Sequence, residues 1–124
     1  MTTIDTPIGP FKLGVYQDHA LRHTWEITAY AVDLAEQMQA KAELPAHTKR
    51  VALGEDDRAL LRVTSEEDLT TFEKAHDDVD ALAWLDLLQD AAEAVINALI
   101  PEGFYAGDDA WAGGWGFWEI EEDA

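Results

Sequence analysis

The second half of this chain carries almost no positive charge, and this limits how it can fold. Residues 65–124 contain seventeen acidic residues and one basic residue, Lys74, whereas residues 1–64 contain nine acidic and seven basic residues. Carboxylates without counter-charges repel one another, which destabilises a compact state while it favours solubility. The second half must therefore turn its acids toward water and gather its apolar side chains inside.

The chain still has enough apolar material for one globular core. Its 124 residues suffice for one domain but not for two independent cores, so we expect residues 1–124 to form a single acidic globular domain. Hydrophobic residues make up 48% of the sequence, and five Trp, four Phe and three Tyr can each bury a large area. This composition argues against a disordered acidic tail.

The sequence also limits the cellular setting. It contains no cysteine, which excludes disulfides and thiolate metal sites. Residues 1–10 lack the basic region and apolar run of a secretory signal. The apolar-rich stretch 79–100 is interrupted by four acidic residues, which excludes a membrane-spanning helix. We therefore expect a soluble, cytoplasmic protein.

Apolar spacing in the first half predicts a strand, a long helix and a hairpin. Alternation around residues 11–16 is typical of a short strand, and residues 18–44 have helical spacing up to Pro45. This helix is apolar on two sides, so we expect it to be central, between a sheet and another helix. Residues 51–53 and 61–63 are expected to pair as a β-hairpin across the polar stretch 54–57.

The second half predicts two helices and a final strand. Ser65 and Asp68 form a capping pair that begins a helix through about residue 75. Acids at 77, 78 and 80 open a longer helix that ends at Pro101, and a last strand is expected over 115–121. On the longer helix, the predicted core face consists of Leu85, Leu88, Ala92, Val95 and Leu99. A polar row lies opposite and consists of Asp86, Asp90, Glu93 and Asn97. The predicted fold class is α+β, with a small antiparallel sheet of about four or five strands packed against two or three helices.

Two histidine-containing groups have spacings that could place metal ligands on one helix face. His19 and His23 are four residues apart with Glu26 one turn further on, and Glu73 and His76 have an i, i+3 spacing. No cysteine assists them, and no second helix offers a matching Glu-x-x-His. We expect His23 to border the core and His19 to be solvated, and we expect no metal or other cofactor.

Catalytic motifs are missing from the sequence. Ser65 lies in a capping context rather than in a Gly-x-Ser-x-Gly elbow, and residues 113–116 lack the Lys and Ser/Thr of a phosphate-binding loop. The acid-rich segments 77–80 and 107–114 do not have the ligand spacing of a calcium-binding EF-hand. We therefore expect a protein that is not an enzyme.

The aromatic residues near the C-terminus allow two interpretations. Trp115, Phe117 or Trp118 could complete the core while neighbouring glycines make tight turns. Alternatively, some of these aromatics, including Trp111, remain exposed as contact anchors, because Trp is enriched at interface hot spots. Both can hold, since successive strand residues face opposite sides.

The uncompensated acids suggest a basic binding partner. A net charge of −18 is opposite in sign to that of a direct nucleic-acid or membrane binder. We therefore expect a non-enzymatic inhibitor that mimics nucleic acid and occupies the basic groove of a DNA- or RNA-handling protein, as phage-type anti-defence proteins do. The residues expected to contact this partner are Asp77, Asp78, Asp80, Asp86, Asp90, Glu93, Asp108, Asp109, Trp111, Glu119, Glu121, Glu122 and Asp123.

Three alternatives remain open on the sequence alone. One is adaptation to high salt, which predicts evenly spread acids, in contrast to the basic segment 44–64. Another is an acidic adaptor or immunity-type protein that binds its partner through the C-terminal aromatic segment. A third is a small His/Glu metal-binding protein, which would use His19, His23, Glu26, Glu73 or His76.

Overall fold

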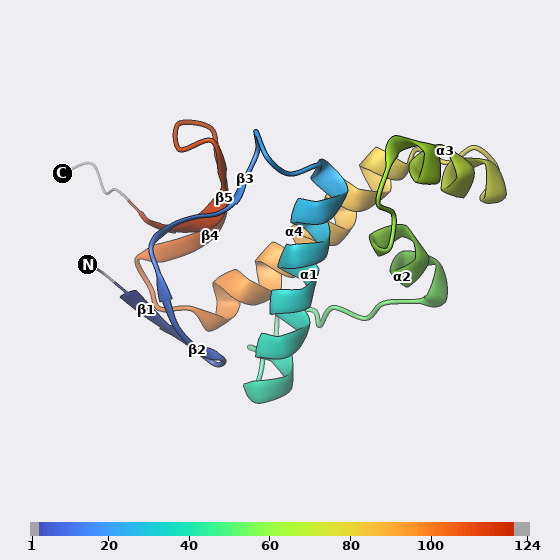
Figure 1. Ribbon diagram of the computed structural model, residues 1–124. Helices are drawn as coiled ribbons and strands as arrows, with labels where there is room; N and C mark the ends of the chain where they lie inside the picture. Colours follow the sequence, from blue (N-terminus) through green and yellow to red (C-terminus); the bar gives the residue numbers. More distant parts are fainter. Residues whose placement is uncertain (1–2, 121–124) are drawn as a thin grey trace.

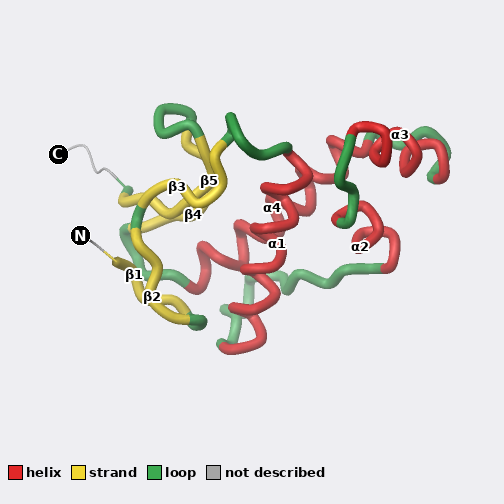
Figure 2. The backbone as a smooth tube through the Cα atoms, viewed as in Figure 1, coloured by secondary structure: helices red, strands yellow, loops and turns green. Residues whose placement is uncertain are grey.

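The computed structural model describes residues 3–120 and has the expected α+β fold (Figure 1). The described residues form four helices, which are α1 (Thr24–Lys41), α2 (Glu55–Leu61), α3 (Glu66–Ala75) and α4 (Ala81–Leu99). They also form five strands, which are β1 (Thr3–Thr6), β2 (Gly9–Lys12), β3 (Gly14–Asp18), β4 (Phe104–Asp109) and β5 (Gly114–Glu119). Helices α1 and α4 cross in the middle, with the strands on one side and α2 and α3 on the other (Figure 2).

The strands form two small antiparallel sheets. β1 pairs with β2, and a second sheet has the order β3-β5-β4. The predicted strand at 11–16 is divided between the two sheets, because Gly14 adopts a φ of 126° and redirects the chain after Leu13. Phe11 of β2 still packs on Phe117 of β5 with ring centroids 5.0 Å apart, so both sheets contribute to one core.

The central position predicted for α1 is confirmed, although the helix is shorter than expected. Ile27, Ala31 and Met38 are buried in the core beneath the sheets. Trp25 belongs to a second buried cluster, which it forms with residues of α2, α3 and α4. The helix begins at Thr24, where the Glu26 carboxylate accepts a hydrogen bond from the backbone N–H of His23 at 2.9 Å.

Residues before Thr24 form a turn instead of the predicted first helical turns. The Asp18 carboxylate accepts a hydrogen bond from the backbone N–H of Ala20 at 2.7 Å, and this closes a local turn at the end of β3. Leu21, which lies within the predicted helix 18–44, is in this turn and is 78% exposed.

The predicted β-hairpin at 51–63 is wrong, because its polar stretch begins helix α2. The Asp57 carboxylate accepts a hydrogen bond from the backbone N–H of Gly54 at 2.8 Å, and three acids occupy the first turn, where the helix dipole favours them. Val51 has no partner strand. Its N–H and C=O are bonded instead by the buried Gln39 side chain, at 2.9 and 2.8 Å.

The helix start predicted at Ser65 for α3 is confirmed, whereas of the acids at 77, 78 and 80 that were expected to open α4 only Asp80 caps it, and Asp77 and Asp78 lie in the turn before the helix. The Ser65 hydroxyl accepts a hydrogen bond from the backbone N–H of Asp68 at 3.1 Å. The Asp80 carboxylate caps α4 by accepting one from the N–H of Ala83, also at 3.1 Å. On α4, Leu85, Ala92 and Val95 are fully buried, as the apolar spacing predicted.

The C-terminal segment forms a β-hairpin whose inner face completes the core. Trp115 and Phe117 are fully buried, which confirms the core interpretation for these two residues. β4 extends through Asp109, so the acid-rich segment 107–109 is part of a strand. The chain turns only after it, with Gly113 at a φ of 77°.

The glycines of β5 allow strand β3 to approach closely. A Cβ atom at Gly116 would collide with the backbone carbonyl of Gly14, and one at Gly114 would lie 2.6 Å from the carbonyl oxygen of Gln17. Both obstacles are backbone atoms and cannot rotate away.

The variant Gly116→Ala is therefore expected to destabilise the protein by about 1–3 kcal/mol, because overpacking forces the strands apart. Gly103→Ala is a useful comparison, since that glycine has open space around its Cβ position and only its φ of 94° to oppose substitution. Urea unfolding measures both. A Gly116→Ala variant as stable as the native protein would contradict the close β3–β5 contact.

Candidate partner-binding surface

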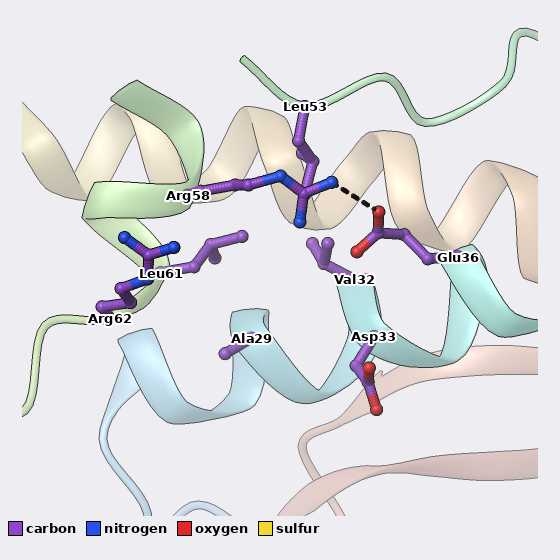
Figure 3. A pocket seen from close by; sticks show the side chains of 8 residues that line it. All are labelled: Ala29, Val32, Asp33, Glu36, Leu53, Arg58, Leu61 and Arg62. Atoms are coloured by element: carbon purple, nitrogen blue, oxygen red, sulfur yellow. Dashed lines mark hydrogen bonds and ion pairs between the residues drawn. The ribbon is translucent and has the colours of Figure 1, made fainter. Parts of the chain in front are cut away.

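Among residues 65–120, no carboxylate forms an ion pair with a lysine or arginine. Among residues 3–120, a single Lys/Arg–carboxylate ion pair occurs, between Arg58 of α2 and Glu36 of α1 at 3.1 Å. Figure 3 shows this pair above a small hollow between α1 and α2, and Arg62 also lines the hollow. The hollow has a volume of about 190 Å³, which is below the range of ordinary small-molecule sites.

Neutral donors satisfy the carboxylates that turn inward. The indole N–H of Trp84 donates to Asp57 at 2.8 Å, and the indole N–H of Trp115 donates to Glu93 at the same distance. A backbone N–H, that of Ala81, donates to Glu73 at 3.0 Å. These bonds fix the side chains and leave the negative charge in place.

One group of exposed acids lies at the turn between α3 and α4. Asp77 and Asp78 both have a φ of 58°, a left-handed conformation that Asp tolerates better than most residues. The ring of His76 stacks on Phe72, and its Nε2 lies 3.2 Å from a carboxylate oxygen of Asp56. Hydrogen bonds to the Phe72 carbonyl and to Asp56 raise the pKa of His76 above its ordinary value. His76 thus connects this turn to an acid of α2.

A second group lies where α4 meets β4. Asp86 and Asp90 are exposed on successive turns of α4, and Asp108 of β4 lines a small hollow together with Asp86. Asp108 accepts hydrogen bonds from Gln89 and from His19, both at 2.8 Å. We call this group of three, Asp86, Asp90 and Asp108, the α4–β4 acids.

Glu93 does not belong to the exposed row in which the sequence placed it. Its carboxylate is half-buried against the sheet, where it accepts hydrogen bonds from Trp115 and, at 3.1 Å, from Gln89. Burial raises the pKa of Glu93 above its ordinary value, and the nearby charges of Asp108 and Asp90 act in the same direction. The polar row of α4 is therefore only partly exposed, because the Glu93 side chain is bonded against the sheet.

Two other polar residues of α4, Asn97 and Gln89, have structural roles. Asn97 exchanges two hydrogen bonds with the backbone of Ala106 in β4, at 2.7 and 3.1 Å. Gln89, which sequence reasoning did not single out, accepts from the Thr28 hydroxyl at 2.9 Å and donates to two carboxylates. Its i, i+4 spacing to Glu93 is the sequence signal that could have found it.

The tip of the β4–β5 hairpin presents the remaining described residues of the predicted surface. The Asp109 carboxylate accepts hydrogen bonds from the backbone N–H groups of Trp111 and Ala112, at 2.9 and 3.1 Å. Trp111 itself is completely exposed, and Glu119 is exposed at the other end of the hairpin. The predicted contact residues Glu121, Glu122 and Asp123 lie outside the described residues.

The expected acidic surface is thus divided into three places, and one continuous row does not form. Asp80 begins α4, while the α4–β4 acids lie further along the helix and on a different side of it. The basic loop at 47–50 borders a groove of about 850 Å³ that is lined by alanines of α4. In the described part of the chain, no ion pair joins this loop to the acids of residues 65–120.

The candidate metal ligands are used in other contacts. His19 bonds Asp108, and His23 stacks on Trp25 with ring centroids 4.4 Å apart. Glu26 bonds the His23 backbone, so these three do not converge. Within residues 3–120, no group of three or more His, Asp or Glu side chains is arranged to hold a metal ion.

The raised pKa of Glu93 leads to a prediction about stability and pH. The ordinary pKa of this carboxyl group is about 4.5. At pH values above it, the folded state holds the Glu93 proton more tightly than the unfolded state does. Its contribution to the free energy of unfolding therefore declines as the pH rises through the raised folded pKa. In Glu93→Gln the amide oxygen can accept the same two hydrogen bonds, and this decline should disappear.

Urea unfolding between pH 4.5 and 7.5 measures the difference between the native protein and Glu93→Gln. Glu43→Gln is the matched control, because Glu43 is exposed and is not among the charges that act on Glu93, and it should not change the slope. A difference between the native protein and Glu93→Gln that is constant over this range would contradict the burial of Glu93. Glu93→Ala leaves the indole N–H of Trp115 without its partner and should cost about 1–3 kcal/mol.

No helix of residues 3–120 combines the length and apolarity needed to cross a membrane. Comparisons with protein-family models, with curated proteins and with solved structures found no match to this chain. The contacts and charges of the chain itself are therefore what indicates its role.

Proposed function

We propose that this protein is a non-enzymatic interaction protein that presents carboxylates to a basic, nucleic-acid-binding site on another protein. The observation that carries this proposal is the missing counter-charge. In the described second half, neutral donors hold the inward carboxylates, and no lysine or arginine pairs with the exposed ones. A surface that keeps its charge in this way attracts sites that are built for phosphates.

A non-enzymatic role agrees with the contacts of the two side chains that could act as acid–base groups. The ring of His76 is stacked on Phe72 and bonded to its carbonyl oxygen at 2.8 Å. Glu93, a half-buried carboxylate with a raised pKa, anchors Trp115. Both of these candidate acid–base groups therefore have a structural partner.

The test is affinity capture with the purified protein at low and high salt, followed by competition with duplex DNA. The α4–β4 acids are changed together to amides in Asp86→Asn/Asp90→Asn/Asp108→Asn. We expect the affinity for the captured partner to fall about tenfold, which is about 1.4 kcal/mol. DNA and salt should each displace the partner, since both act on the same charges.

A matched control removes three exposed acids from the first half, in Asp5→Asn/Asp33→Asn/Glu43→Gln. Both triple variants change the net charge equally, so only the position of the acids differs. The control should bind within about threefold of the native protein. Equal losses in the two variants, or a partner that DNA does not displace, would contradict the proposed mimicry.

The exposed Trp111 favours a second candidate function. A completely exposed Trp on a hydrogen-bonded turn is typical of a contact anchor, which an acidic adaptor or immunity-type protein would use. In that case Trp111→Ala weakens binding more than the α4–β4 triple variant does.

A further inference from the structure

We propose that the outer face of the β4–β5 hairpin binds an arginine side chain of the partner protein, and this rests on the proposed function. A hollow of about 710 Å³ lies on this face. Three aromatic and two acidic residues line it together with Leu13, Gly14 and Ile120, and no lysine or arginine among the described residues lines it. The residues that matter are Tyr105, Trp111, Trp118, Asp109 and Glu119.

Strand register brings the aromatic walls together. Tyr105 of β4 is directly opposite Trp118 of β5, so the two side chains share a face of the sheet. Trp115 and Phe117 of β5 turn to the other face and are buried. The same alternation that fills the core therefore leaves an aromatic pair outside.

Hydrogen bonds order the Trp118 and Tyr105 side chains and the backbone turn at Trp111 before any ligand binds. The indole N–H of Trp118 donates to the carbonyl of Gly107 at 2.9 Å. The hydroxyl of Tyr105 donates to the Asp109 carboxylate at 3.4 Å, and that carboxylate also fixes the turn that carries Trp111. A preformed site loses less conformational freedom on binding.

Charge and shape together select arginine. Tyr and Trp faces attract cations, and the planar guanidinium stacks on them while its N–H groups bond carboxylates. Asp109 and Glu119 supply carboxylate acceptors among the lining residues, and the net charge of −18 favours the approach of a cation. A lysine ammonium carries the positive charge but is not planar. The ureido group of citrulline is planar but carries no charge.

The probes follow from this comparison. N-acetyl-arginine amide is titrated into the intact protein, while the indole N–H resonances of Trp111 and Trp118 are followed by NMR. N-acetyl-citrulline amide and N-acetyl-lysine amide serve as matched ligands. We expect saturable shifts with the arginine probe, weaker binding of the lysine probe and no saturable shift with citrulline.

Variants locate the site. Trp111→Ala should weaken arginine binding about fivefold or more without changing the unfolding midpoint, because this side chain is completely exposed. Glu119→Gln should weaken it in the same direction. The matched control is Leu87→Ala, which removes an exposed apolar side chain from α4 and should leave binding unchanged.

Two results would overturn the arginine site. One is a citrulline titration that matches the arginine titration. The other is a Trp111 resonance that moves with protein concentration alone, which would indicate that a second copy of the chain occupies the hollow. Neither result depends on the capture experiment. If the arginine probe binds but no DNA-displaceable partner is captured, the proposed function fails and the site remains.

Discussion

The structure depends on inward carboxylates that are held by indole, amide and backbone N–H donors instead of by lysine or arginine. Glu93, which lies between α4 and β5, shows this most clearly, because the indole of Trp115 and the amide of Gln89 donate its hydrogen bonds. Asp80, Asp57 and Asp109 follow the same rule, with backbone and indole N–H groups as donors. Such bonds order the chain and keep its charge, which an ion pair would cancel. The fold is therefore built in a way that preserves a negative field.

That arrangement links stability to the proposed role. Unpaired like charges destabilise the folded state, and Asp77 and Asp78 add residues in a left-handed conformation that glycine would adopt more easily. The buried aromatic core around Trp115 offsets these costs. A partner with a basic site would relieve the repulsion on binding. The acids that reduce the stability of the free protein would then contribute to the stability of the complex.

Much of the fold could be predicted from local signals. Capping at Ser65 and Asp80 and the apolar spacing of α4 located two helices, because these signals are short-range. The hairpin at 51–63 was wrong because Gly54 and the acids after it are compatible with both a turn and a helix start, and tertiary contacts of Gln39 and Trp84 select the helix. The site was predicted less well. The exposure of Asp86 follows from the apolar spacing of α4, but the inward turn of Glu93 depends on Trp115, which is distant in sequence, and the binding role of these acids stays a prediction.

The response of stability to salt tests the uncompensated field most directly. The free energy of unfolding would be measured from about 10 mM to about 150 mM NaCl, where the screening length falls from about 30 to about 8 Å. Screening of unpaired carboxylates should raise the stability of the native protein, and the rise should be smaller in Asp77→Asn/Asp78→Asn/Asp86→Asn/Asp90→Asn. A stability that is flat or falls with salt would mean that attractive ion pairs dominate the surface, and it would contradict a negative field without counter-charges.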